Sequence, residues 1–222
     1  MAKRRARDLD RRSKPLVDER QEYVLIVCEG RKTEPNYFEE LQEEYQLGIV
    51  NIDIIPADEG TDPMSVVRTA ESRQDSKKKT RKRPFDRVYC VFDRDEHGNF
   101  DDASRQITAL QGQGFRSARS WPCFEFWLLL HFGYTRKSFE RGGGRSACQN
   151  CEKELQSKMK DYRKGKTGVF GELFPRLEKA KGHAASAMED AKSIGEENPF
   201  TEIHELVGYL QDLNGMKSAC LY

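Results

Sequence analysis

Residues 87–98, RVYCVFDRDEHG, decide the fold, because an apolar strand pattern runs here directly into an acidic turn. Residues 23–30, YVLIVCEG, have the same form and end in Glu29 and a glycine. Continuous apolar runs of this kind are typical of strands buried on both faces, as in parallel sheets. The two segments therefore predict neighbouring buried strands with acidic residues at their carboxyl ends.

Strands alternate with helical patterns around these two segments. Apolar positions recur at helical spacing after Thr33-Glu34-Pro35 and again after Asp62-Pro63. The other predicted elements are a strand at 49–55, a helix at 101–110, a strand at 115–120 and a buried helix within 124–132. This order favours an α/β fold, a parallel sheet flanked by helices. Ligands of such sheets bind at the carboxyl ends of the strands.

The chain divides into three predicted parts. Residues 1–20 form a basic segment, interpreted as a flexible arm, and residues 21–135 form the α/β domain. Residues 136–222 form a helical C-terminal extension with candidate helices at 152–162, 169–179 and 201–213. Basic or glycine-rich loops and the dipeptide Asn198-Pro199 separate these helices.

Composition predicts a cytoplasmic protein without a membrane partner. The chain has 222 residues, 34% of them charged, and no apolar run approaches the roughly 20 residues that span a bilayer. Its basic start lacks the apolar core of a secretory signal. The six cysteines suit a reducing compartment. Cys148 and Cys151 have CxxC spacing, but no second such pair completes a zinc site, so the sequence favours helical packing for them.

Glu29, Asp93 and Asp95 are the candidate catalytic and metal-binding residues. Carboxylates gathered at strand ends repel one another unless a cation or a proton neutralises them, and oxygen ligands select Mg²⁺ or Mn²⁺. Arg94 is expected to point away, so that Asp93 and Asp95 face one ion. A metal there suits phosphoryl transfer on a nucleic-acid backbone. The alternative is that these acids are turn formers and helix caps.

Glu125 is a fourth candidate metal ligand, because it lies within an apolar segment where a charged carboxylate needs a partner. It either reaches the metal edge or pairs with a basic group such as Arg119, and both alternatives stay open. His97 could assist proton transfer, although a solvent-facing loop position is the simpler interpretation. His131 is expected in the core or at a helix end.

Basic residues are the candidate phosphate-binding groups, with solvated surface charge as the alternative. Arg31 and Lys32 stand beside Glu29, and Arg94 stands between the two aspartates. The run KKKTRKR is of the kind that attracts phosphate backbones. Its candidates are Lys77, Lys78, Lys79, Arg81, Lys82 and Arg83.

Three ordered strings, VCEGRKTEPNYFEEL, VYCVFDRDEHGNF and PCFEFWLLLHF, together resemble the RloB family of bacterial proteins, which carry a Toprim-like domain. The resemblance covers about residues 20–135, and NPFTEIHELV resembles a C-terminal feature of the family. It implies a Toprim-like, Rossmann-like fold in which Glu29 is a metal ligand or general acid/base and Asp93 and Asp95 hold Mg²⁺. The helical extension has no Toprim counterpart.

The resemblance also implies a function, since these proteins resemble abortive-infection components and occur beside restriction-modification genes, often with an ABC-type ATPase. It implies a nuclease effector of antiphage defence that cuts DNA or RNA, tRNA included. An ATPase would be another chain, because this sequence lacks a G-x-x-x-x-G-K-[ST] motif. The alternative is a non-catalytic metal- and nucleic-acid-binding module serving that ATPase; a topoisomerase would need a longer chain. Homo-oligomer formation stays open.

Overall fold

The computed structural model describes residues 22–47, 51–58, 60–80, 82–94 and 97–219. The predicted arm at residues 1–20 lies outside the described residues, and so do Asp95 and Arg81. None of the described helices combines the length and apolar character that crossing a bilayer requires.

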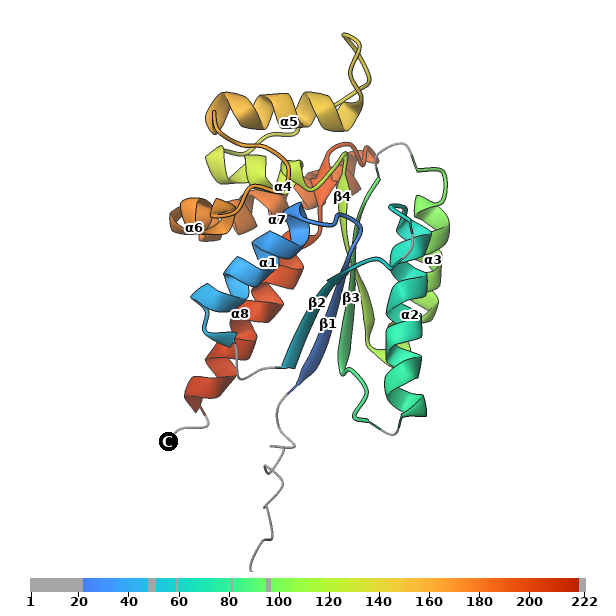
Figure 1. The fold of residues 1–222 in the computed structure, drawn as a ribbon. Helices are drawn as coiled ribbons and strands as arrows, with labels where there is room; N and C mark the ends of the chain where they lie inside the picture. Colours follow the sequence, from blue (N-terminus) through green and yellow to red (C-terminus); the bar gives the residue numbers. More distant parts are fainter. Residues whose placement is uncertain (1–21, 48–50, 59, 81, 95–96, 220–222) are drawn as a thin grey trace, which may run out of the picture.

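A five-stranded sheet in the order β2-β1-β3-β4-β5 forms the centre of the molecule (Figure 1). Four strands pair in parallel: β1 (Tyr23–Cys28), β2 (Asn51–Pro56), β3 (Arg87–Asp93) and β4 (Phe115–Trp121). These are the four predicted strands, and the predicted α/β fold class is confirmed. The short β5 (Phe200–Thr201), which was not predicted, pairs antiparallel with β4.

Alternation along β1 divides the core into two layers. Val24, Ile26 and Cys28 face one hydrophobic cluster, whereas Leu25 and Val27 face the other. The second layer is covered by α2 (Pro63–Lys79) and α3 (Phe100–Ala109). The first is covered by α1 (Thr33–Glu44), α4 (Glu125–Leu129) and the helices of the extension (Figure 1).

The extension shares the hydrophobic core of the α/β domain. Its helices are α5 (Ala147–Lys158), α6 (Val169–Leu173), α7 (Leu177–Ile194) and α8 (Ile203–Ala219). Their buried apolar residues belong to the same cluster as those of α1 and α4, except Ala191 of α7, which lies in the other layer. Short 3₁₀ turns lie at Gln111–Gln113, Leu130–Phe132 and Phe174–Arg176. The two parts therefore form one core.

The predicted bounds of the extension's helices were partly wrong. α5 begins at Ala147 rather than 152, because Ser146 and Gln149 form a capping box there. A 3₁₀ turn interrupts the helix predicted at 169–179, and α7 then continues far beyond residue 179. Small alanines bury one face of α7 at helical spacing, a weaker apolar signal than leucines would give.

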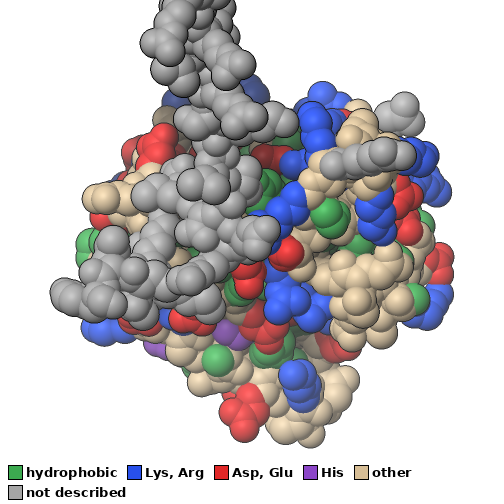
Figure 2. Space-filling model, turned by 90° about the horizontal axis from the view of Figure 1, so that it is seen from below, with side chains coloured by type: hydrophobic (Ala, Val, Ile, Leu, Met, Phe, Trp, Pro, Cys, Tyr) green, Lys and Arg blue, Asp and Glu red, His purple; other side chains and the backbone are tan. Residues whose placement is uncertain are grey.

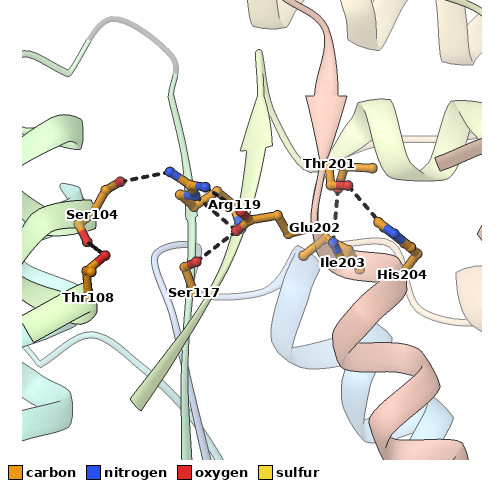
Figure 3. Close-up of polar contacts among 8 residues, drawn as sticks. All are labelled: Ser104, Thr108, Ser117, Arg119, Thr201, Glu202, Ile203 and His204. Carbon is orange, nitrogen blue, oxygen red and sulfur yellow. Dashed lines mark hydrogen bonds and ion pairs between the residues drawn. The ribbon is translucent and has the colours of Figure 1, made fainter. Parts of the chain in front are cut away.

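Arg119 on β4 clamps the extension to the sheet through Glu202 (Figure 3). Glu202 Oε2 accepts hydrogen bonds from Arg119 Nε at 3.0 Å and from the Ser117 hydroxyl at 2.9 Å, and Arg119 Nη2 pairs with Oε1. The backbone N–H of Glu202 donates to the Arg119 carbonyl at 2.8 Å. The suggested pairing of Arg119 with Glu125 was therefore wrong.

Candidate functional site

Glu29 and Asp93 lie side by side at the carboxyl ends of two neighbouring strands. The backbone N–H of Glu29 donates to the Val91 carbonyl at 2.9 Å, which carries the pairing of β1 and β3 one residue past Cys28. The backbone N–H of Asp93 donates to Glu29 Oε2 at 2.9 Å. His97 Nε2 lies 3.0 Å from Glu29 Oε1, so this histidine, which follows β3 in the chain, contacts Glu29. Asp95 lies outside the described residues.

A pocket of about 280 Å³ opens beside these residues. Its lining combines the turn after β1, the end of β3, α4 and a loop of the extension: Gly30, Arg31, Lys32, Thr33, Glu34, Asp93, Glu125, Lys164 and Gly165. Asp93, Glu125, Arg31 and Lys32 were predicted site residues. Glu34 and Lys164 were not.

Glu34 folds over the Gly30 backbone at the floor of this turn. A Cβ atom on residue 30 would stand 2.0 Å from Glu34 Oε2, so glycine is required for this approach. Burial raises the pKa of Glu34 to about 7, against the hydrogen bonds that its carboxylate accepts from the backbone and with a contribution from Glu125. Glu34 was interpreted only as part of a helix start. Its helical spacing to Tyr37, Phe38 and Leu41 would have shown that it belongs to the buried face of α1.

Asp93 carries the strongest electrostatic conflict of the site. Burial raises its pKa well above the usual range, and the negative charges of Glu34, Glu29 and Glu125 raise it further. Four carboxylates so arranged disfavour full ionisation unless a cation joins them. The arrangement of these carboxylates therefore favours the binding of a proton or a cation.

Glu125 is almost completely buried, at 2% exposure, and receives its partners from the extension. The Tyr162 hydroxyl donates to Glu125 Oε1 at 3.0 Å, and Lys164 Nζ lies 3.6 Å from the same oxygen. Burial disfavours the charged form of Lys164, but Glu125 and the other acidic groups around it together outweigh burial and raise the pKa of the ammonium group. Glu125 thus lies at the pocket with Asp93 and also pairs with a cation. Nothing in the local sequence around residues 162–164 pointed to these contacts.

The loop that carries Lys164 is fastened to one face of α1. Gly165 N donates to Thr33 Oγ1 at 2.9 Å, and Asn36 Nδ2 donates to the Gly165 carbonyl at 3.2 Å. Further along, Glu40 accepts hydrogen bonds from the backbone N–H groups of Gly168 and Phe170 at 2.5 and 2.8 Å. Thr33, Asn36 and Glu40 follow the i, i+3, i+7 spacing that places residues on one face of a helix, so this face of α1 fastens the loop beside the pocket.

Of the predicted basic residues near the acidic edge, two lie at the pocket and one points away from it. Arg31 and Lys32 are exposed at the pocket. Arg94 turns away from it, forming an ion pair with Asp101 at 3.0 Å and stacking on Trp121 and Phe100.

The basic run lies at the opposite end of the sheet. Lys77–Lys79 close the last turn of α2, whose 17 residues extend about 25 Å from its start near the strands' carboxyl ends. Lys77 and Arg83 lie over the Tyr23 ring, where β1 begins. Lys78 contacts Gln113, and Lys82 is exposed. Figure 2, which views this end, shows Lys and Arg side chains interspersed with Asp and Glu. The structure does not bring this run to the pocket.

A second set of potential ligands adjoins Glu125. Among the described side chains, Cys123, Glu125 and Cys148 form a group whose ligand atoms all lie within 4.8 Å of one another, and all three are buried. This cluster is a candidate metal centre with soft thiol donors. His131, by contrast, is a core residue, as predicted: its Nδ1 lies 3.1 Å from the Trp127 carbonyl, and burial lowers its pKa to about 4.

Comparisons with known proteins return one match. The family model described as RloB-like protein matches residues 24–210, which span both the α/β domain and most of the extension. No curated protein and no solved structure shows significant similarity to the chain.

Proposed function

The chain belongs to the RloB-like protein family, and from this premise we propose that it is a Mg²⁺- or Mn²⁺-dependent nuclease of the Toprim type. Its substrates would be phosphodiesters of DNA or RNA, tRNA included. One observation carries the proposal: Asp93 and Glu29 lie at the carboxyl ends of adjacent strands with Glu34 of α1 close by, and burial together with the charges of Glu34 and Glu29 raises the pKa of Asp93.

The donors suit a hard divalent cation, because carboxylate oxygens are the ligands that Mg²⁺ and Mn²⁺ prefer. We assign this role to Glu29, Asp93 and Asp95, whereas Glu125 lies beside Asp93 in the lining of the pocket. The ion, when bound, would neutralise charge on a phosphoryl group and lower the pKa of a water molecule.

The chain's own residues supply the remaining functions of a phosphodiesterase. Arg31 and Lys32 are exposed at the pocket and are suited to bind the flanking phosphates. Glu29 and His97 share a contact of 3.0 Å, which allows a proton to be held between them near the pocket. Lys164, whose side chain is 53% exposed, offers a further cation for a substrate phosphate.

The antiphage role and the partner ATPase are part of the same proposal. They rest on the family's resemblance to abortive-infection components. The lack of an ATP-binding motif in this sequence supports a separate ATPase chain. We therefore expect cleavage to depend on that partner if the isolated chain is inactive.

The test compares the purified protein with Asp93→Asn on DNA and total RNA in Mg²⁺ or Mn²⁺, with and without a neighbouring ATPase. We expect the variant to lose at least 100-fold in cleavage rate, on the order of 3 kcal/mol, because a central metal ligand is gone. Asp102→Asn is the matched control, because the carboxylate of Asp102 is exposed and forms its ion pair with Arg105 of the same helix. Equal cleavage by wild type and Asp93→Asn would refute the proposal.

A non-catalytic metal- and nucleic-acid-binding module is the second candidate. The observation in its favour is the separation of the basic run from the acidic pocket by about the length of α2, roughly 25 Å. Such a module would bind nucleic acid with equal affinity in wild type and Asp93→Asn and would retain its biological activity in the variant.

A further inference from the structure

Three thiols and one carboxylate gather where the segment before α4 meets α5. Cys123 Sγ lies 3.9 Å from the Cys148 carbonyl, and Cys148 Sγ lies 4.0 Å from Glu125 Oε2. Cys151 also interacts with the Cys123 thiol, although its Sγ is not part of the group whose ligand atoms all lie within 4.8 Å of one another. Cys148 and Cys151 stand one turn apart on α5, so both face the same neighbour. The four donors come from two parts of the chain more than 20 residues apart.

Packing alone gives no reason for this convergence. Thiols are weak hydrogen-bond donors, and apolar side chains would fill the same volume without a buried carboxylate beside them. Cys28 and Cys90, which are equally buried in the strands, show what packing thiols look like: each lies among apolar neighbours of the sheet.

The surroundings favour an anionic ligand set that is occupied by a cation. Cys123, Cys148, Cys151 and Glu125, once ionised, carry four negative charges, of which a divalent ion and the Lys164 ammonium group together balance three. Lys164 Nζ is placed for this, 3.5 Å from Cys148 Sγ and 3.6 Å from Glu125 Oε1. The Tyr162 hydroxyl orients the carboxylate from behind, as outer groups do around bound metals.

We propose that Cys123, Cys148 and Glu125 bind one Zn²⁺ ion, with Cys151 turning in from the next turn of α5 as the fourth ligand of a closed, tetrahedral structural site. Thiolate donors select zinc over the hard ions of the acidic pocket, and four protein ligands leave no open position for substrate. The ion joins the α/β domain to α5 and holds the loop of Tyr162 and Lys164 at the pocket. The inference goes beyond the proposed nuclease activity and does not depend on it.

Metal analysis of the full-length protein tests the site without any activity assay. The protein is purified without chelators under reducing conditions, and its zinc is measured by mass spectrometry. We expect about one zinc per chain in the wild type. Cobalt substitution should give the thiolate-to-cobalt charge-transfer absorption that carboxylates alone do not produce.

Cys148→Ala and Cys90→Ala form the matched pair of variants, because both remove a buried thiol but only one belongs to the cluster. Cys148→Ala should lose at least tenfold in zinc affinity and the cobalt band, whereas Cys90→Ala should keep both. Glu125→Gln, which preserves the shape of the side chain, should also weaken zinc binding.

Three outcomes would overturn the proposal: wild type that holds no zinc after reconstitution, zinc content unchanged in Cys148→Ala, or iron in place of zinc. Wild-type metal content and the cobalt band do not depend on whether any variant folds. A nuclease-inactive protein that holds zinc would refute the proposed function alone, and an active one without zinc would refute this site alone.

Discussion

Single residues of the pocket differ chiefly in how their charge is neutralised. Glu125 pairs with Lys164 and accepts a hydrogen bond from Tyr162. Glu29 accepts a hydrogen bond from the Asp93 backbone and contacts His97. For Glu34, hydrogen bonds from the backbone and the charge of Lys164 lower the pKa, but burial raises it by more. With a pKa of about 7, Glu34 therefore changes its protonation state near neutral pH, and a bound cation would favour its ionised form.

Glu34→Gln should make stability less dependent on pH. The pKa of Glu34 rises from 4.5 to about 7 on folding, so the native state binds more protons than the unfolded chain in this window. The free energy of unfolding of the wild type should therefore fall as pH rises through it, by on the order of 3 kcal/mol. Urea denaturation at several pH values without divalent ions measures the effect.

The control for this experiment is Glu39→Gln, an exposed glutamate on the same helix. Its pH profile should match the wild type, and adding Mg²⁺ to the wild type should reduce the fall, because a cation favours the ionised carboxylates. Identical profiles for Glu34→Gln and wild type would contradict the assignment.

Among the elements, α1 contributes to the site in two ways. Its first turn supplies Glu34, and its outer face fastens the extension's loop through Thr33, Asn36 and Glu40. Glu40 serves as a cap for the start of α6, where Gly168 precedes the first helical residue. A side chain from another helix thus satisfies two backbone N–H groups that α6 itself leaves without partners.

Glu40→Ala should destabilise the protein by about 1–2 kcal/mol, because the Gly168 and Phe170 N–H groups lose their charged acceptor. The neighbouring Glu39→Ala, an exposed position, should change stability by less than about 0.5 kcal/mol. Thermal or chemical denaturation compares the two. Equal effects of both variants would show that Glu40 does not cap α6.

In the molecule as a whole, the α/β domain and the extension depend on each other. One face of the sheet is covered largely by helices of the extension, and β5 adds its strand beside β4 (Figure 1). The Arg119–Glu202 pair joins the two parts at this edge, with side chains only 28% and 11% exposed. The charge of each partner is therefore compensated mainly by the other.

Glu202→Ala should cost about 3 kcal/mol, since it leaves the Arg119 guanidinium, on a side chain only 28% exposed, without its carboxylate. Although burial opposes it, the contact with Arg119 lowers the pKa of Glu202, so this contribution should be lost as pH falls through the folded-state value. Replacing both residues by leucine should recover much of the loss. Chemical denaturation of the single and double variants measures these changes in stability, with Glu197→Ala at an exposed position as the control. A loss below about 1 kcal/mol in Glu202→Ala would contradict the role of this ion pair.

The amino-acid sequence by itself determined the four parallel strands, the helices that alternate with them, and the acidic residues that follow β1 and β3. These features are local, because apolar runs, helix caps and residues that end a strand act on their immediate neighbours. Glu29 and Asp93 were found because parallel strands bring their carboxyl ends to one edge whatever the rest of the chain does.

Only the tertiary structure decided the partners of the buried charges. Lys164 pairs with Glu125, Arg119 pairs with Glu202, and Cys123 contacts Cys148. Each contact joins segments connected by loops whose length and path no local pattern encodes. It also placed the basic run Lys77–Arg83 far from the pocket, because α2 runs back along the sheet. A buried charge must find a partner, but which partner it finds depends on how distant segments pack, and that is a property of the whole core.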